Sequence, residues 1–126
     1  MQINKLDHVN IRTNQLAVMI DWYRDVLGLE LGERPDFNFN GAWMYAGNDP
    51  VVHLIEVEGE AGHGSEDKLK LEHFALSASG CSEFLSRLDS KGITFRRSGI
   101  KSLNLIQINV WDPDGNHIHI DFDEHE

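Results

Sequence analysis

An internal repeat spans almost the whole sequence. Residues 6–11 (LDHVNI) match residues 71–76 (LEHFAL), and residues 52–55 (VHLI) match residues 118–121 (IHID). The first two segments are 65 positions apart and the second two are 66 positions apart, so both matches share nearly one offset. Self-similarity at a fixed period indicates that one supersecondary unit occurs twice. The fold must therefore be one that two copies of the same unit can build.

Each copy reads as a strand, a helix and three further strands. In the first copy, the spacing of apolar residues predicts a strand at 4–12, a helix at 14–27 and strands at 29–33, 42–46 and 51–57. In the second copy it predicts a strand at 70–78, a helix at 81–91 and strands at 93–97, 105–111 and 116–122. The glycine-rich, acidic stretch between the copies indicates a surface linker. We therefore expect one α+β domain, with module 1 at about 1–57, a linker at 58–68 and module 2 at about 69–126.

Composition limits the classes of function. The chain has 126 residues and a formal net charge of -10, which disfavours binding to nucleic acid or to anionic membranes. No apolar run approaches the roughly 20 residues that a membrane span requires, and we expect no signal peptide. The single cysteine, Cys81, cannot form an internal disulfide. A chain without an internal disulfide fits the reducing cytoplasm, where we expect this protein. Cys81 lies on the apolar side of the second predicted helix, so we expect it to be a core residue.

Four histidines occupy equivalent positions in the two copies. His8 and His73 lie in the first strands, whereas His53 and His119 lie in the fourth strands. A single histidine on a strand is more often hydrogen-bonded or solvated than functional, but four at matched positions suggest a shared role. In a strongly curved sheet, the polar faces of these strands converge on one cavity and leave the helices outside. Because neutral imidazole is a good ligand for transition metals, the pattern predicts a divalent metal site for Zn, Fe, Ni, Co or Mn.

The residues around these histidines are weaker candidates. His117 and Asp121 alternate with apolar residues on the last strand and therefore share the face of His119. His117 either supports His119 as a hydrogen-bond donor or faces solvent, and Asp121 is a lesser candidate for a ligand. His63 in the linker and His125 in the acidic tail read as solvated surface residues.

Four segments resemble the vicinal oxygen chelate superfamily, which includes glyoxalases, bleomycin- and fosfomycin-resistance proteins and extradiol dioxygenases. The segments are residues 6–9 (LDHV), 22–29 (WYRDVLGL), 71–76 (LEHFAL) and 112–116 (DPDGN), in the order found in that family. The resemblance implies two βαβββ modules that form a cupped, incomplete β-barrel around a divalent metal, with the helices on the outer face. It does not imply one reaction, because this scaffold hosts several chemistries.

The resemblance also implies roles for the histidines. His8 and His73 match the metal-binding histidines of the two first strands. His53 matches the fourth-strand position of the first module, which is a ligand in glyoxalases but not in every member, and we consider it as a fourth ligand or as a general base. His119 stands where most metal-binding members have a glutamate, which is linked to proton transfer in glyoxalase-like members and completes a 2-His-1-carboxylate face in dioxygenases. A neutral imidazole there leaves more positive charge on the metal, which strengthens its Lewis acidity at some cost in affinity. Alternatively, the substitution marks a member that has given up the family chemistry.

Two functions remain open from the sequence. The first is a metal-dependent enzyme of lyase, isomerase or ring-cleaving type that acts on a small oxygenated molecule. The second is a metal-free binding protein of the bleomycin-resistance type that holds a planar ligand between aromatic side chains. We expect a homodimer, with the site formed either within one chain or across two. The candidates for substrate contact are Asn10, Arg12, Trp43, Tyr45, Gln107 and Asn109.

Overall fold

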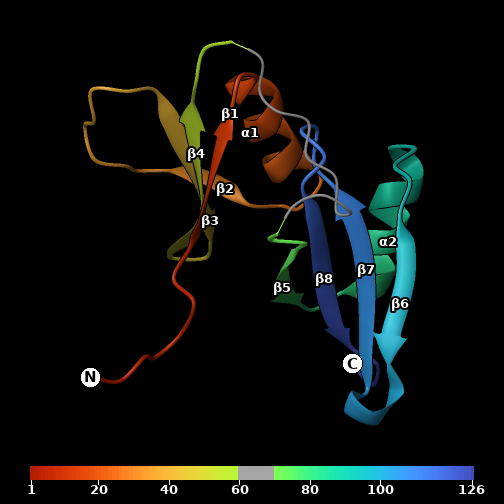
Figure 1. The fold of residues 1–126 in the computed structure, drawn as a ribbon. Coiled ribbons are helices and arrows are strands. Elements are labelled where there is room, and N and C mark those ends of the chain that lie inside the picture. The colour runs from red at the N-terminus through yellow and green to blue at the C-terminus, as the bar shows by residue number, and fades with distance from the viewer. Residues whose placement is uncertain (60–69) are drawn as a thin grey trace. The chain divides into compact units, whose positions relative to one another are not determined.

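The computed structural model of the protein describes residues 1–59 and 70–126 (Figure 1). The chain divides into two compact units, Met1–Gly62 and His63–Glu126. Most of the predicted linker lies outside the described residues, and His63 lies there as well. Within the described ranges, no helix combines the length and the apolar character needed to cross a membrane.

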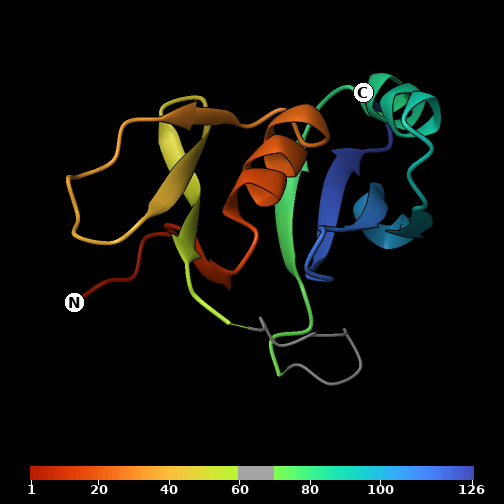
Figure 2. The same ribbon diagram turned by 90° about the horizontal axis from the view of Figure 1, so that it is seen from above.

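The first unit is a βαβββ module. Its elements are β1 (Val9–Thr13), α1 (Leu16–Asp25), β2 (Glu30–Gly32), β3 (Gly41–Ala46) and β4 (Asp49–Glu56). The four strands form one sheet in the order β1-β4-β3-β2, in which β1 runs parallel to β4 and the other pairs are antiparallel. The segment before β1 runs without helix or strand from the N-terminus (Figure 2).

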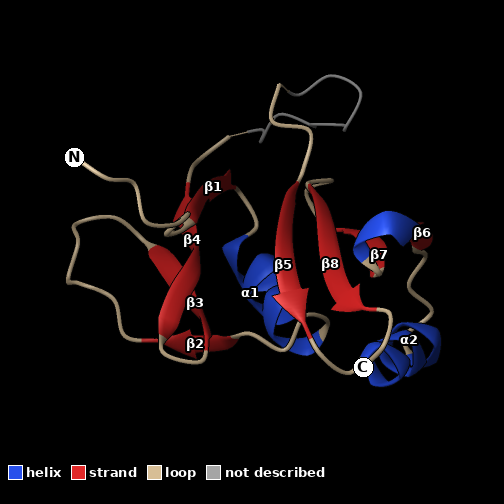
Figure 3. Cartoon of the chain, turned by 90° about the horizontal axis from the view of Figure 1, so that it is seen from below, coloured by secondary structure: helices blue, strands red, loops and turns tan. Residues whose placement is uncertain are grey.

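The second unit repeats this topology. Its elements are β5 (Phe74–Ala78), α2 (Cys81–Ser90), β6 (Arg96–Ile100), the short 3-10 helix η1 (Lys101–Leu103), β7 (Leu105–Trp111) and β8 (His117–Asp123) (Figure 3). The sheet order is β5-β8-β7-β6, with β5 parallel to β8. The strand predicted at 93–97 begins three residues later, because its ladder with β7 runs from Arg96 to Ile100. The predicted α+β class and the duplicated βαβββ order are therefore confirmed.

Each helix buries the apolar side that its sequence predicted. Met19 and Tyr23 of α1 are fully buried, and α1 contacts β2, β3 and β4. In the second unit Leu88 of α2 is fully buried, and the ring of Phe84 lies 6.0 Å from that of Phe122 in β8. Apolar residues at this spacing form one stripe on a helix, so burying the stripe holds the helix to its sheet. Side chains at alternate positions of the strands consequently point to the opposite face.

The first strand of the second copy begins later than predicted. The predicted strand covered residues 70–78, but β5 begins at Phe74 and leaves His73 immediately before it. The partner strand β8 begins at His117, directly after the turn at 112–116. The ladder between the two strands begins with Phe74 opposite Ile118.

The first strand of the first copy shows the same difference. The predicted strand covered residues 4–12, but β1 begins at Val9, whose partner is Val52 of β4. His8 consequently precedes its strand, as His73 does in the second unit.

Candidate metal centre

In the first unit, two of the predicted ligands form a stacked pair. The imidazole rings of His8 and His53 have centroids 3.9 Å apart and an interplanar angle of 10°. The indole ring of Trp43 also stacks on His53, at 4.1 Å and 12°. Trp43 lies directly opposite His53 in the β3–β4 ladder, which accounts for this contact. The register of the sheet thus places two imidazoles and one indole side by side.

Hydrogen bonds show which ring nitrogen of His8 and of His53 carries hydrogen. The His8 Nδ1 atom lies 2.7 Å from the carboxylate of Asp7. An ionised carboxylate only accepts hydrogen bonds, so His8 carries its hydrogen on Nδ1 and keeps a lone pair on Nε2. The His53 Nε2 atom donates to the carbonyl of Pro50 at 3.0 Å, which leaves the lone pair of the neutral ring on Nδ1. Each ring therefore presents one nitrogen that can bind a metal.

The surroundings favour the neutral form of His53. Its residue is 9% exposed, and burial, followed by the nearby charge of His8, lowers the pKa of His53 below its ordinary value. The hydrogen bond from His8 lowers the pKa of the exposed Asp7 carboxyl. A neutral imidazole beside an ionised carboxylate is the protonation state that a metal ligand and its supporting acceptor require.

The second unit contains the equivalent pair. The rings of His73 and His119 are stacked with centroids 3.9 Å apart and an interplanar angle of 9°. The buried His117 lies beside them, with its ring centroid 4.8 Å from that of His119. One ligand atom from each of these three histidines lies within 4.8 Å of the others. Both halves of the chain therefore repeat the stacked pair on matching elements.

The ring nitrogens that are available to a metal also correspond between the two units. The His73 Nδ1 atom lies 2.6 Å from the Glu72 carboxylate, which leaves Nε2 with the lone pair. The Nδ1 atom of His119 is buried and has no hydrogen-bond partner among the residues that the structure describes. Burial, and then the charges of His73 and His117, lower the pKa of His119. A buried polar atom without a partner costs free energy, and a bound metal ion would remove that cost. The donor set thus fits a transition metal.

His117 has a different environment from its two neighbours. It is 3% exposed, so the solvent-facing alternative is wrong. Its Nδ1 atom lies 2.8 Å from the carboxylate of Glu72, and its Nε2 atom lies 2.9 Å from Oδ1 of Asn109. Both ring nitrogens consequently face oxygen atoms within the same unit.

The predicted substrate-contact residues are spread over both sheets. Asn10 and Arg12 are exposed on β1, and Gln107 is half-buried on β7. The hydroxyl of Tyr45 donates to the carbonyl of Glu33. Trp43 contacts a candidate ligand, and Asn109 is buried beside His117. Asp121, two residues beyond His119, has a buried Oδ1 atom without a hydrogen-bond partner in the described part of the chain. Their roles toward a substrate stay predictions.

Two functional candidates were missed by the sequence reasoning. Asp7 and Glu72 each hold the Nδ1 atom of the histidine that follows them. The signal was present, because an acidic residue directly precedes the first-strand histidine in both copies of the repeat. Such carboxylate–histidine contacts orient metal-binding imidazoles.

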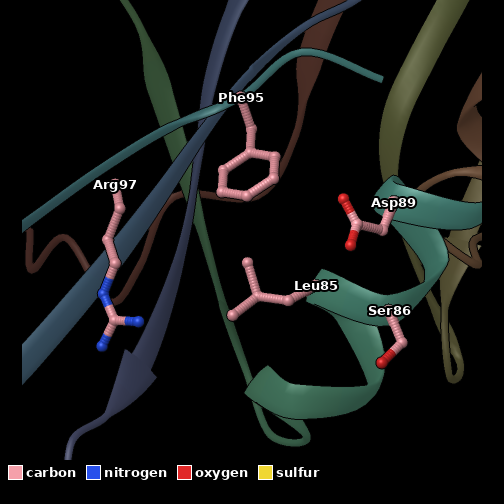
Figure 4. A pocket seen from close by; sticks show the side chains of 5 residues that line it. All are labelled: Leu85, Ser86, Asp89, Phe95 and Arg97. Carbon is pink, nitrogen blue, oxygen red and sulfur yellow. The ribbon is translucent and has the colours of Figure 1, made fainter. Parts of the chain in front are cut away.

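A separate hollow of about 360 Å³ lies in the second unit. Its lining comes from α2 and from the chain at the start of β6: Leu85, Ser86, Asp89, Phe95 and Arg97 (Figure 4). None of these side chains is an imidazole, and none belongs to the histidine pairs. This hollow is therefore distinct from the candidate metal centre.

Comparison with known proteins agrees with this architecture. The family model described as Glyoxalase/Bleomycin resistance protein/Dioxygenase superfamily matches residues 5–120. The chain belongs to this superfamily. The match includes both histidine pairs and extends from before β1 into β8.

Relatives within the superfamily differ in their named reactions. The chain is 29% identical over 117 residues to lactoylglutathione lyase of Salmonella typhimurium, covering 88% of this chain and 87% of that protein. It is 29% identical to biphenyl-2,3-diol 1,2-dioxygenase 3 of Rhodococcus globerulus, covering 94% of this chain and 63% of that protein. The fold is similar to that of a glyoxylase/bleomycin resistance protein/dioxygenase domain from Frankia sp. EAN1pec, with a TM-score of 0.79, 16% identity and coverage of 97% and 99% of the two chains.

Proposed function

We propose that the protein is a metal-dependent enzyme that acts on a small oxygenated molecule. The observation that carries the proposal is the repeated imidazole pair, His8 with His53 and His73 with His119. We propose that these four side chains are ligands of a divalent metal. In both first-strand histidines the Nδ1 atom is held by a carboxylate, which leaves Nε2 to bind the metal.

A divalent ion in such a site would hold two neighbouring substrate oxygens and stabilise negative charge that develops on them. The chain itself supplies four neutral nitrogen donors, with His119 at the position where most metal-binding members of the superfamily have a carboxylate. The site would therefore keep more positive charge than one containing glutamate. This favours substrates that bind as anions, and it disfavours a reaction in which a carboxylate at this position moves the proton.

His53 is the candidate for proton transfer. Its lone pair lies on Nδ1, and burial lowers its pKa, so the ring stays neutral and can accept a proton near pH 7. Trp43 stacks on the same ring and would restrict its rotation. Proton transfer and ligation are alternatives for His53, because one lone pair serves only one of them at a time.

Metal analysis tests the proposal directly. Protein purified without chelator and reconstituted with Zn²⁺, Fe²⁺, Ni²⁺, Co²⁺ or Mn²⁺ should retain about one ion per chain after gel filtration. The His73→Ala variant should lose that ion, whereas His125→Ala, which removes an exposed histidine of the tail, should keep it. Wild-type protein that retains no ion under any of these conditions would overturn the proposal and favour the metal-free binding protein.

The reaction type can be separated with compounds named in the relatives. Metal-loaded protein should be assayed with S-lactoylglutathione and with biphenyl-2,3-diol in the presence of oxygen. Because an imidazole replaces the carboxylate, we expect little lyase activity on the glutathione thioester. If lyase turnover is fast enough to require an efficient acid–base group, the proposed effect of His119 in place of the carboxylate is contradicted.

We also propose a homodimer, and complementation tests which chain supplies each half of the site. A mixture of His8→Ala and His73→Ala chains, unfolded and refolded together, restores metal binding only if the two halves come from different copies. Sedimentation of the wild-type protein measures the dimer independently. A monomer that binds one ion would refute the dimer and leave the metal site intact.

A further inference from the structure

A chain of hydrogen bonds runs from the interior of the second unit to a candidate ligand. Asn109 Oδ1 accepts from His117 Nε2 at 2.9 Å, and His117 Nδ1 contacts Glu72 Oε1 at 2.8 Å. The other carboxylate oxygen, Glu72 Oε2, lies 2.6 Å from His73 Nδ1. Each side chain in this hydrogen-bonded series contacts the next, so the orientation of His73 depends on residues deep in the sheet.

The buried end of this hydrogen-bonded series, at Asn109, is fixed. The Asn109 side chain is 1% exposed, and its Nδ2 atom donates to the carbonyl of Arg96 and to Oγ of Ser98, both at 3.0 Å. A carbonyl oxygen only accepts hydrogen bonds, so the amide nitrogen of Asn109 must face Arg96. The amide oxygen of Asn109 is thereby turned toward His117.

The ring of His117 is also held in place. It stacks on Trp111 with centroids 5.1 Å apart and an interplanar angle of 9°. Trp111 lies directly opposite His117 in the β7–β8 ladder. Its Nδ1 atom faces Glu72 and its Nε2 atom faces Asn109, so both ring nitrogens lie against oxygen atoms. His117 is therefore a supporting group, although it lies within the cluster formed with His73 and His119.

The first unit lacks this support. The Asp7 side chain, which holds His8, is 79% exposed, whereas the side chain of His117 is 1% exposed. At the position of the repeat that corresponds to His117, the first copy has Val51. Opposite the fourth-strand histidine, the first unit has Trp43 in place of Asn109. Among residues 1–59 and 70–126, the carboxylate of Asp7 therefore has no equivalent of the buried imidazole that anchors Glu72.

We propose that His117 is a positioning residue that, together with Asn109, holds the Glu72 carboxylate and thereby fixes the ring of His73 with its Nε2 atom available to a metal. The second unit then has its His73–His119 pair pre-organised for metal, to a greater extent than the pair of the first unit. The part of this inference that concerns metal affinity rests on the proposed function. The part that concerns the orientation of His73 does not, because it applies to the metal-free protein.

The orientation is tested first, in the absence of metal. Long-range ¹H–¹⁵N NMR of ¹⁵N-labelled protein identifies which ring nitrogen of His73 carries hydrogen. We expect Nδ1–H in the wild type, and a mixture of the two tautomers in His117→Leu and in Glu72→Gln. In His117→Gln, whose amide still donates to Glu72, we expect the Nδ1–H form to return in part. Persistence of the pure Nδ1–H form in His117→Leu would overturn the proposal.

Metal binding is tested next by titration with Co²⁺. We expect His117→Leu and Glu72→Gln to weaken binding by about 10- to 100-fold, as loss of a group that orients a ligand does. Asp7→Asn is the matched control in the other half, and we expect a loss of less than about tenfold. Equal losses in Glu72→Gln and Asp7→Asn would contradict the pre-organised second half.

The absorption spectrum at saturating Co²⁺ separates a positioning residue from a ligand. If His117 only positions other groups, His117→Leu should reach the same visible spectrum as the wild type at higher Co²⁺ concentration. A changed spectrum would show that His117 itself binds the ion and would refute the proposal. Should His117→Leu fail to fold, His117→Gln decides the same question, because it also removes the imidazole and keeps an amide that can donate to Glu72. If the wild type binds no Co²⁺, the proposed function fails, and the NMR result still decides the role of His117.

Discussion

The turn before β8 offers a quantitative test of how the site is held. The carboxylate of Asp112 accepts hydrogen bonds from the backbone N–H groups of Asp114, at 3.0 Å, and Asn116, at 2.9 Å. It also accepts one from the side-chain amide of Asn116, at 2.9 Å. The residue is 4% exposed, and β8 begins directly after this turn with His117. Asp112 therefore fixes the start of the strand that carries two of the clustered histidines.

The expected loss in Asp112→Ala follows from these three contacts. Hydrogen bonds to charged groups contribute about 1.5–3 kcal/mol each, but contacts that share one acceptor are not additive. Because the half-buried Asn116 regains some bonds to water, we expect the free energy of unfolding to fall by about 3–4 kcal/mol. Asp112→Asn keeps one acceptor oxygen and should lose about 1–2 kcal/mol.

Urea unfolding followed by circular dichroism measures both losses. The control is Asp36→Ala, an exposed aspartate between β2 and β3, which we expect to change the unfolding free energy by less than about 0.5 kcal/mol. A loss below about 1 kcal/mol in Asp112→Ala would refute the reasoning, since it would show that the turn forms without its central acceptor.

Three further predictions concern α2 and the histidines. The Glu126 carboxylate accepts from the N–H groups of Gly80 and Cys81 at the start of α2, so Glu126→Ala should lower the urea-unfolding free energy by about 1 kcal/mol. Burial raises the pKa of the Cys81 thiol, so its reaction with iodoacetamide at pH 7.5 should be several-fold slower in folded than in unfolded protein. Burial lowers the pKa values of His53 and His119 below the ordinary 6.5, so the folded protein binds fewer protons than the unfolded chain does. Metal-free protein should therefore lose unfolding free energy in urea as the pH falls below about 6.5, and this slope should be shallower in His53→Gln.

Much of the architecture was predictable because it depends on periodicity. Alternating apolar residues and the apolar stripes of two helices indicated the same βαβββ order twice, and the sheets have that order. The starts of β1 and β5 were not predictable from alternation, because alternation along one strand does not show where its pairing with another strand begins. Pairing begins with Val9 opposite Val52 and with Phe74 opposite Ile118, so it depends on the partner strands β4 and β8.

The histidine pair within each unit was predictable from the sequence, whereas the side chains that hold each pair in place were not. Equivalent registers place His53 beside β1 and His119 beside β5, so the repeat itself carried that information. The burial of His117 depends instead on its contacts with Glu72 and Asn109, which lie 45 and 8 residues away. From the sequence of the strand alone, a buried polar residue beside a turn cannot be distinguished from one that faces solvent.

The two copies therefore differ in what surrounds the same imidazoles. An indole ring packs on His53 in the first unit, whereas the second unit has a buried amide, Asn109, opposite His119. Stacking restricts a ring without assigning its hydrogen, but a hydrogen bond fixes both the orientation and the tautomer. Trp43 can thus limit the motion of His53, while Asn109, acting through other side chains, determines which nitrogen His73 presents. A duplicated backbone can supply equivalent ligand positions, and substitutions at neighbouring positions then give the two halves unequal rigidity.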